Sequence, residues 1–171
     1  GDLGDRVVHT LERGSGLAVD LELDAVSLQG GGGRLLFTRS ESPPSSDWNG
    51  DGDFLDQVVF YWDPLLPGAT NTRIASVGGA AAASTGSLLL IVPESGEGDL
   101  NGDGDAGDLV YVLHDVATQT NTSLRVAVTT PGAGLTADGR GVLLVSESGQ
   151  GRDLNGDGGL SDSVLHALVV P

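Results

Sequence analysis

Short apolar runs recur along the whole chain, separated by polar and glycine-rich segments. Within each run the apolar residues are almost continuous, which is typical of β-strands that are covered on both faces. Residues 17–23 differ, because apolar residues alternate there with small or acidic ones, and this pattern predicts a strand with one solvated face. The nearly continuous runs occupy residues 34–42, 58–62, 87–95, 109–113, 140–148 and 164–170.

An aspartate-rich loop separates the apolar runs in three places. The pattern Asp-x-Asn-Gly-Asp-Gly opens each copy, and an aspartate closes it at the tenth position. The closing aspartates lie 52 and 54 residues apart, and a glutamate precedes each loop at a constant spacing of 53 residues. Residues 1–5 match the end of the same loop, so we expect the chain to start inside a fourth copy. The three full loops are residues 47–56, 99–108 and 153–162.

Each repeat therefore consists of four short predicted strands, with the aspartate loop between the second and the third. We predict an all-β fold of tandem four-stranded antiparallel units of about 52 residues, β-propeller-like and incomplete at both ends. Its parts are a partial unit at 1–24, full units at 25–78 and 79–131, and a unit at 132–171 that lacks its last strand. The weakly marked first strands are expected at 25–28, 79–83 and 132–136, polar turns at 70–72 and 120–122, and fourth strands at 73–77 and 123–128.

A family resemblance supports this organisation. It rests on residues 135–146 (LTADGRGVLLVS), the following loop, the third-strand runs and the turn at 115–122. Together these segments look like the blade of TolB-like, WD-type β-propellers. The resemblance spans nearly the whole chain through short motifs, and it implies a ring of four-stranded blades. Only residues 138–140 (DGR) keep the usual turn of such a blade, since the other units have GGR at 32–34 and TGS at 85–87. A β-sandwich or a solenoid of hairpins therefore stays open.

The three loops carry oxygen ligands at alternate positions, as calcium loops do. Calcium takes about six to eight hard oxygen ligands. Positions 1, 3, 5 and 10 supply carboxylates or an amide, position 6 is a turn glycine, and the variable position 7 suits a backbone carbonyl. The loops resemble those of dockerins, thrombospondin repeats and integrin propellers, which implies about three Ca²⁺ sites. The candidate ligands are Asp47, Asn49, Asp51, Asp53 and Asp56; Asp99, Asn101, Asp103, Asp105 and Asp108; and Asp153, Asn155, Asp157, Gly159 and Asp162.

Ordinary Asp/Asn/Gly turns are the alternative interpretation of any single loop. Three copies at matching places argue against it, since each loop without a cation would hold four or five like charges together. Valine at position 12 disfavours a true EF-hand, and magnesium fits less well because it prefers few protein carboxylates and retained waters. Glu41, Glu94 and Glu147 are open to two roles, as a further metal ligand or as a cap of the turn.

Composition and charge exclude several classes of partner. The 171 residues include 24 acidic and 8 basic side chains, for a formal net charge of −16, which disfavours nucleic acids and anionic membrane surfaces. Cysteine is absent, so disulfides and thiolate chemistry are excluded. The longest apolar run, 88–93, is far shorter than the roughly 20 residues that span a bilayer, so we expect no membrane insertion.

No catalytic constellation stands out in the sequence. The Gly-x-Ser-x-Gly, P-loop and His-Glu-x-x-His motifs are absent, and the loops account for the paired acids. His9 and His166 occupy a strand position where other units have hydrophobic residues, which favours packing over catalysis. Trp48, Tyr61 and Trp62 fit either strand packing or a sugar-binding platform.

These observations predict a non-catalytic calcium-binding repeat protein that is secreted or exposed at the cell surface. Calcium outside cells is abundant enough to fill loops of modest affinity. The expected role is structural, adhesive or self-assembling, including the formation of filaments. Unpaired strand edges at both ends favour association with other copies or with the remainder of a longer parent chain. The alternative is a fragment of a propeller enzyme or a lectin whose active site lies on blades absent from this sequence.

Overall fold

The computed structural model describes residues 6–11, 13–77, 80–128, 132–136 and 138–169. Nearly all of its regular structure is β-strand in antiparallel sheets, so the expected all-β class is confirmed. One helical turn, α1 (Glu94–Glu97), is present in the described residues. Residues 1–5, which match the end of a fourth aspartate loop, lie outside the described residues. None of the described helical structure is long and apolar enough to cross a membrane.

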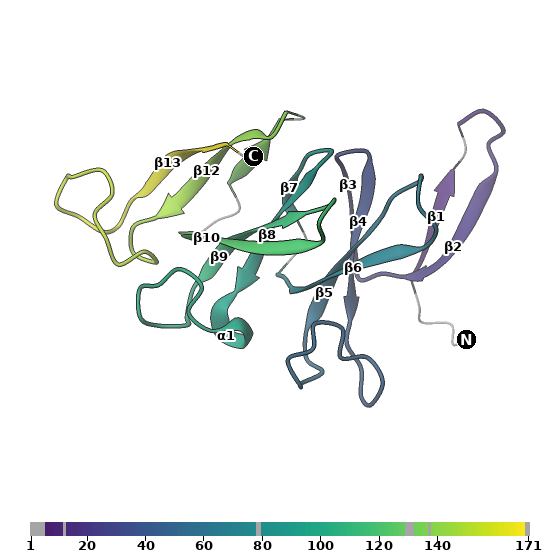
Figure 1. Cartoon of the computed structure of the whole chain (residues 1–171), viewed down its shortest axis with the longest axis horizontal. Helices are drawn as coiled ribbons and strands as arrows, with labels where there is room; N and C mark the ends of the chain where they lie inside the picture. The colour runs from purple at the N-terminus through teal and green to yellow at the C-terminus, as the bar shows by residue number, and fades with distance from the viewer. Residues whose placement is uncertain (1–5, 12, 78–79, 129–131, 137, 170–171) are drawn as a thin grey trace.

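Within the described residues, the strands form four sheets that follow one another along the chain (Figure 1). Each strand pairs with its neighbours in sequence, so the order within every sheet is the order along the chain. The four sheets stand side by side, and this part of the chain closes no ring. The sheets are β1 (Val7–Leu11) and β2 (Ala18–Asp24); β3 (Ser27–Gly31), β4 (Arg34–Ser40), β5 (Gln57–Trp62) and β6 (Ala69–Ala75); β7 (Ala80–Ala83), β8 (Ser87–Pro93), β9 (Leu109–Asp115) and β10 (Thr120–Val128); and β11 (Ala133–Leu135), β12 (Arg140–Ser146) and β13 (Ser163–Val169).

Burial follows the apolar pattern in the two central sheets and departs from it in the last one. All residues of β8 except the last are buried, because neighbouring sheets cover both of its faces. β13 also has an apolar sequence, yet its residues alternate between exposed and half-buried. The expectation of two covered faces is therefore wrong for this strand. The physical reason is that no described sheet lies against its outer face, where Leu165 and Val169 are exposed.

The sheets pack face to face through a repeated arrangement of apolar side chains. The sheets β3–β6, β7–β10 and β11–β13 are called the first, second and third sheet below. Leu36, Val59 and Tyr61 of the first sheet form a buried cluster with residues of the second, including Leu88 and Leu90. Because successive strand residues point to opposite faces, Leu89, Ile91 and Tyr111 project from the other side of that second sheet. There they form the next cluster, together with Leu143 and Val145 of the third sheet. One face of each central sheet thus packs on the opposite face of its successor.

The outer strands β2, β6 and β10 carry the same β-bulge. The register shifts at equivalent places where they pair with β1, β5 and β9. Glu22, Arg73 and Arg125 lie at these bulges with φ between 55° and 59°, a left-handed conformation that is uncommon for residues other than glycine. The backbone N–H of each donates to the side chain two residues earlier, at 2.8, 2.8 and 3.0 Å. The repeat is therefore present in backbone geometry as well as in sequence.

The expected polar turns before the fourth strands are wrong. Residues 70–72 lie inside β6 and residues 120–122 lie inside β10. Strand pairing tolerates their polarity because the side chains find partners. Asn71 donates to the carbonyl of Trp48 at 2.7 Å, and the buried Thr72 hydroxyl donates to the carbonyl of Val59 at 2.8 Å. Asn121 donates to the carbonyl of Thr72 at 2.9 Å, which joins two sheets.

The first strands of neighbouring sheets approach each other closely, since β7 contacts both β3 and β11. The turn between β3 and β4 meets the end of β7 at Gly32. A Cβ atom on Gly32 would lie 2.1 Å from the carbonyl oxygen of Ser84, far inside contact distance. The neighbouring Gly33 has nothing within 4 Å of a Cβ position, although both glycines have positive φ. Glycine is therefore needed at 32 for space as well as for backbone conformation.

We predict that Gly32→Ala destabilises the protein more than Gly33→Ala. Both changes place a side chain in the left-handed region, which costs about 1 kcal/mol. Only the change at Gly32 also forces the two sheets apart, which we expect to add about 1–3 kcal/mol. Urea unfolding of both variants measures the difference. Equal loss of stability in the two variants would contradict the close approach of the sheets.

Candidate metal centre

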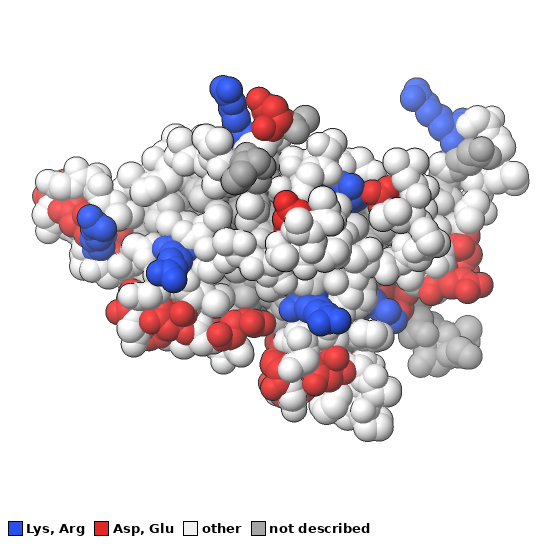
Figure 2. Space-filling view, viewed as in Figure 1, with Lys and Arg blue, Asp and Glu red and all other residues white. Residues whose placement is uncertain are grey.

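The three aspartate loops occupy equivalent places in the fold. They connect β4 to β5, β8 to β9 and β12 to β13, so each loop joins the second strand of its sheet to the third. In Figure 1 all three loops project from the same edge of the row of sheets. Figure 2 shows acidic side chains gathered in clusters along this edge. The repeat in sequence thus becomes a row of three acidic loops on one side of the molecule.

Each loop is held by hydrogen bonds from its own backbone to its own side chains. In the third loop, Asp153 accepts the N–H groups of Gly156 and Gly158 at 2.6 and 2.9 Å, and Asn155 accepts that of Asp157 at 2.9 Å. The second loop repeats these contacts with Asp99 and Asn101. The glycines at positions 4 and 6 all have positive φ, so the tight winding of the loop requires glycine at both places. These glycines are Gly50, Gly52, Gly102, Gly104, Gly156 and Gly158.

A buried glutamate clamps each loop to the end of the preceding strand. Glu94 is fully buried, and its Oε1 accepts the N–H groups of Leu100 and Asn101 at 2.6 and 3.0 Å. Its own N–H donates to the carbonyl of Asp108 at 2.9 Å, which closes the loop. Glu41 and Glu147 make the matching contacts in the other two loops. The capping role that the sequence left open is therefore present in all three copies.

The structure brings the glutamates together with loop aspartates into three acidic groups. Within the described residues, each group has carboxylate oxygens that all lie within 4.8 Å of one another. The position 7 aspartates Asp53 and Asp105 belong to these groups, where the sequence suggested only a backbone ligand. The predicted Asp47, Asp99, Asp103 and Asp162 are not members. The groups are Glu41, Asp51, Asp53 and Asp56; Glu94, Asp105 and Asp108; and Glu147, Asp153 and Asp157.

The remaining predicted ligands surround these groups. Asn49 Nδ2 donates to Asp51 and Asp56, both at 3.0 Å, and so lies between these two carboxylates. Asn155 makes the same pair of contacts with Asp157 and Asp162 at 3.3 Å each. Asp103 accepts the N–H of Asp105 at 3.1 Å. Gly159 has no carboxylate to offer, and its N–H donates to Asp157 at 2.8 Å.

Burial and the nearby like charges raise the pKa of the aspartate that closes each of the first two loops. Burial and then the carboxylates of Asp103, Asp105 and Glu94 raise the pKa of Asp108. Burial and the neighbouring Asp51 raise the pKa of Asp56 in the same way. The ion pairs among the described residues join arginines to Asp63, Asp24 and Asp138, and none of them reaches a loop acid. Among the described residues, no arginine therefore forms an ion pair with the negative charge of the loops.

Each of the first two loops also contacts the next sheet, a feature that the sequence pattern did not indicate. Asn101 Nδ2 donates to the carbonyl of Gly149 at 2.8 Å, across the boundary between the second and third sheets. Glu97 of α1 lies close enough to the first loop that Asp51 and Asp56, after its own burial, raise its pKa. The candidate metal centres therefore lie at the seams between sheets.

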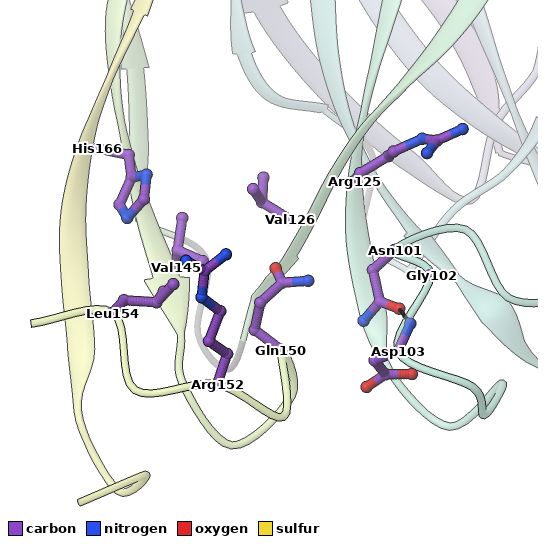
Figure 3. Close-up of a pocket in the computed structure, with 10 residues that line it drawn as sticks. All are labelled: Asn101, Gly102, Asp103, Arg125, Val126, Val145, Gln150, Arg152, Leu154 and His166. Atoms are coloured by element: carbon purple, nitrogen blue, oxygen red, sulfur yellow. Dashed lines mark hydrogen bonds between the residues drawn. The ribbon is translucent and has the colours of Figure 1, made fainter. Parts of the chain in front are cut away.

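A cavity of about 430 Å³ lies beside the second loop, between the second and third sheets (Figure 3). Its lining includes Asp103, Arg125, Arg152 and His166. In Figure 3 Asp103 and His166 lie on opposite sides of the cavity, and Arg125 points away from the other three side chains. The cavity therefore does not bring a carboxylate and an imidazole together for acid–base chemistry, which requires hydrogen-bond distance.

The aromatic side chains do not form an exposed platform. Tyr61 is fully buried between the first two large sheets. Trp48 packs edge-on against Phe60 at 5.5 Å, and the guanidinium of Arg39 covers its ring at 4.7 Å. Trp62 packs on the same cluster as Phe60. Of the two roles open from the sequence, the structure supports strand packing.

Comparisons with known proteins provide no assignment. A scan against protein-family models finds no match, and searches of curated proteins and of solved structures find none either. The resemblance to TolB-like propellers therefore stays a prediction, and the function must be argued from the loops themselves.

The buried His114 provides a pH-dependent test of the packing between sheets. Its ring contacts Tyr61 at 5.8 Å, its Nδ1 pairs with Asn121 Oδ1 at 2.8 Å, and its buried Nε2 has no partner. Burial lowers the pKa of His114, against smaller opposing effects of Asn121 and Asp115. The unfolded chain therefore binds this proton at a higher pH than the folded chain. Stability is complete above about pH 6.5 and falls as the pH drops below it.

We predict that His114→Gln removes this pH dependence. Between pH 7.5 and 5.5 the wild-type protein should lose about 1 kcal/mol of stability through His114, and the variant should not. His9→Gln is the matched control, because His9 is exposed in β1 and its change should leave the wild-type behaviour intact. Urea unfolding at fixed calcium and two pH values measures both. Parallel loss of stability in wild type and His114→Gln would contradict the prediction.

Proposed function

We propose that this chain is a calcium-binding repeat protein with a structural role. The observation that carries the proposal is the convergence of a buried glutamate with loop aspartates within 4.8 Å in each of three repeats. Charged groups that are buried or crowded are normally paired or coordinate a metal. No ion pair among the described residues reaches a loop acid, so a bound cation would supply the missing positive charge.

The donor set fits calcium. Carboxylate and amide oxygens supply every candidate ligand, and hard oxygen ligands in a flexible loop suit Ca²⁺. The unpartnered, buried Oε2 of Glu147 is a further oxygen that a cation would satisfy. Magnesium fits less well, because it keeps several waters and takes few protein carboxylates. Three bound calcium ions would also reduce the net charge from −16 to −10.

The position of the loops supports a structural role for the cation. Glu97 and Gly149 contact loops that belong to the preceding sheet. A cation in such a loop neutralises repulsion at the boundary and so favours the packed arrangement of the two sheets. We propose that the sheets stack as β-propeller-like units, with first strands packed together and the loops along one edge, and that the chain carries no chemistry of its own.

The location follows from the affinity expected of such loops. Loops that bind calcium weakly fill only where calcium is near millimolar, as it is outside cells. We therefore place the protein outside the cell or at its surface, in a role of scaffolding, adhesion or assembly.

We predict that calcium raises the melting temperature and that excess chelator lowers it. A ligand that binds only the folded state stabilises it by about 2.7 kcal/mol per site at a concentration of 100 Kd. Differential scanning fluorimetry with calcium, with magnesium and with a calcium chelator measures the effect. Calcium should exceed magnesium at equal concentration. A melting curve that is the same in calcium and in chelator would refute calcium binding.

The two ends of the row of sheets support self-association. At the C-terminal end, Val142, Leu165 and Val169 are exposed on one face of the third sheet. On the matching face of the second sheet, Leu89 is equivalent to Val142 and Tyr111 to Leu165, and the third sheet buries both. These equivalences follow from the repeat spacing. The last sheet therefore presents a face of the kind that is covered in each preceding sheet.

The N-terminal end presents the opposite kind of face. In β1, Val8 is buried while Val7 and Leu11, on the other side of the strand, are exposed. The equivalent side of β5 is packed in a cluster with Leu23 of β2 and with Ala25, which follows that strand. Because one end shows the face that the other end is built to cover, we propose a second copy of this chain as the partner, joined head to tail. Such a heterologous contact extends into a filament or closes into a ring.

We predict that Leu165→Asp and Leu11→Asp each stop the growth of the assembly, through opposite faces. Each variant keeps one apolar face intact and loses the other. Because a head-to-tail contact needs both faces, each variant alone should stay a monomer. An equal mixture should form a dimer that grows no further, because the two remaining apolar faces are complementary. Analytical ultracentrifugation in calcium measures the species present. A wild-type chain that is monomeric at high concentration, or a mixture that stays monomeric, would contradict the head-to-tail contact.

A further inference from the structure

Glu147 differs from the other two clamping glutamates in one contact. It directly follows β12 and is fully buried. Its Oε1 accepts the N–H groups of Leu154 and Asn155 at 2.7 and 3.1 Å, so this oxygen holds the start of the third loop. Its Oε2 is buried and has no hydrogen-bond partner. In the first two loops, the matching Oε2 atoms accept the N–H groups of Asp56 and Asp108 at 3.4 and 3.2 Å.

A buried carboxylate oxygen without a partner is costly. Removal from water without compensation costs on the order of 1–3 kcal/mol for a polar group and more for a charged one. Glu147 also offers a carboxylate oxygen within 4.8 Å of oxygens of Asp153 and Asp157. These neighbours increase the cost, since they bring further negative charge and no donor. A hard cation among the three carboxylates would satisfy the orphaned oxygen and the repulsion together.

We propose that Glu147 is a direct ligand of a calcium ion in the third loop through Oε2, while Oε1 keeps its two backbone contacts. The inference rests on the proposed calcium function and adds a ligand that precedes the loop in sequence. It divides the site between a rigid part and an adaptable part. Glu147 is fixed at the end of a strand, whereas Asp153 and Asp157 belong to the loop. Cation binding in the third loop would thereby be coupled to the pairing of β12 with β13.

The conservative change Glu147→Gln separates ligation from capping. The glutamine carbonyl can still accept the N–H groups of Leu154 and Asn155, but an amide NH₂ replaces the buried, unpartnered Oε2. A residue that only caps the loop would therefore keep its function in this variant. A direct ligand would lose charge and an oxygen, which we expect to weaken calcium at the third loop by about 100-fold. Glu22→Gln is the matched control, since Glu22 is an exposed residue of β2.

Two readouts separate this inference from the proposed function. Isothermal titration of the full chain with calcium should give three ions for wild type and Glu22→Gln, and two strong sites for Glu147→Gln. Terbium luminescence excited through tryptophan reports the first loop, which contains Trp48, and should be the same in all three proteins. Without calcium, Glu147→Gln should melt at or above the wild-type temperature, because an unpaired buried charge is removed.

The outcomes are distinct. Wild type that binds no calcium would overturn the proposed function itself. Three ions of unchanged affinity in Glu147→Gln would overturn the ligand role of Glu147 and leave the proposed function standing. If the variant does not fold, a crystal structure of the wild-type chain grown in calcium decides the point. Oε2 at about 2.3–2.6 Å from an ion in the third loop supports the inference. An intervening water, or an ion held by the aspartates alone, would overturn it.

Discussion

The buried glutamate carboxylate at the end of the second strand is the interaction on which each repeat depends. One of its oxygens accepts two backbone N–H groups from the start of the aspartate loop, as Glu94 does from Leu100 and Asn101. This contact fixes the direction in which the loop leaves the strand, and so decides where its aspartates converge. It also places a negative charge where no described arginine compensates it. The same group therefore holds the loop in place and contributes to the negative charge on which the proposed cation site rests.

That negative charge has consequences beyond the loop, because the loops lie at the boundaries between sheets. Apolar clusters hold the broad faces of neighbouring sheets together, and Asn101 reaches across one boundary at the loop edge. At the other boundary, burial and then the carboxylates of Asp51 and Asp56 raise the pKa of Glu97, so like charges meet where the sheets approach. Hydrophobic packing and loop charge thus act on the same contact with opposite sign. A cation that removes the repulsion would leave the hydrophobic packing between the sheets unopposed. Metal binding would in this way favour a stiff array of sheets.

Regularity of the backbone makes such an array extensible. The bulges at Glu22, Arg73 and Arg125 bend the outer strand of each sheet in the same manner. Close approach at Gly32 brings the first strands together. Because each sheet repeats these features, the face that one sheet presents suits the opposite face of the next. Nothing in this geometry depends on whether the next sheet belongs to the same chain, and this is the physical basis of the head-to-tail association proposed above.

The sequence by itself determined the strand class, the strand order and the loop composition, because period-two patterns, continuous apolar runs and Asp/Asn/Gly spacing are local properties. It misplaced the turns at 70–72 and 120–122, since Asn71 finds its partner in the first aspartate loop and Asn121 on another sheet. It left the role of Glu147 open, because burial and the missing partner of Oε2 are seen only in the fold. It did not indicate Glu97 or Gly149, because their contacts come from another repeat. Tertiary structure alone decided which oxygens converge and which faces stay uncovered. Burial and the proximity of charges arise only when separate sheets are brought together.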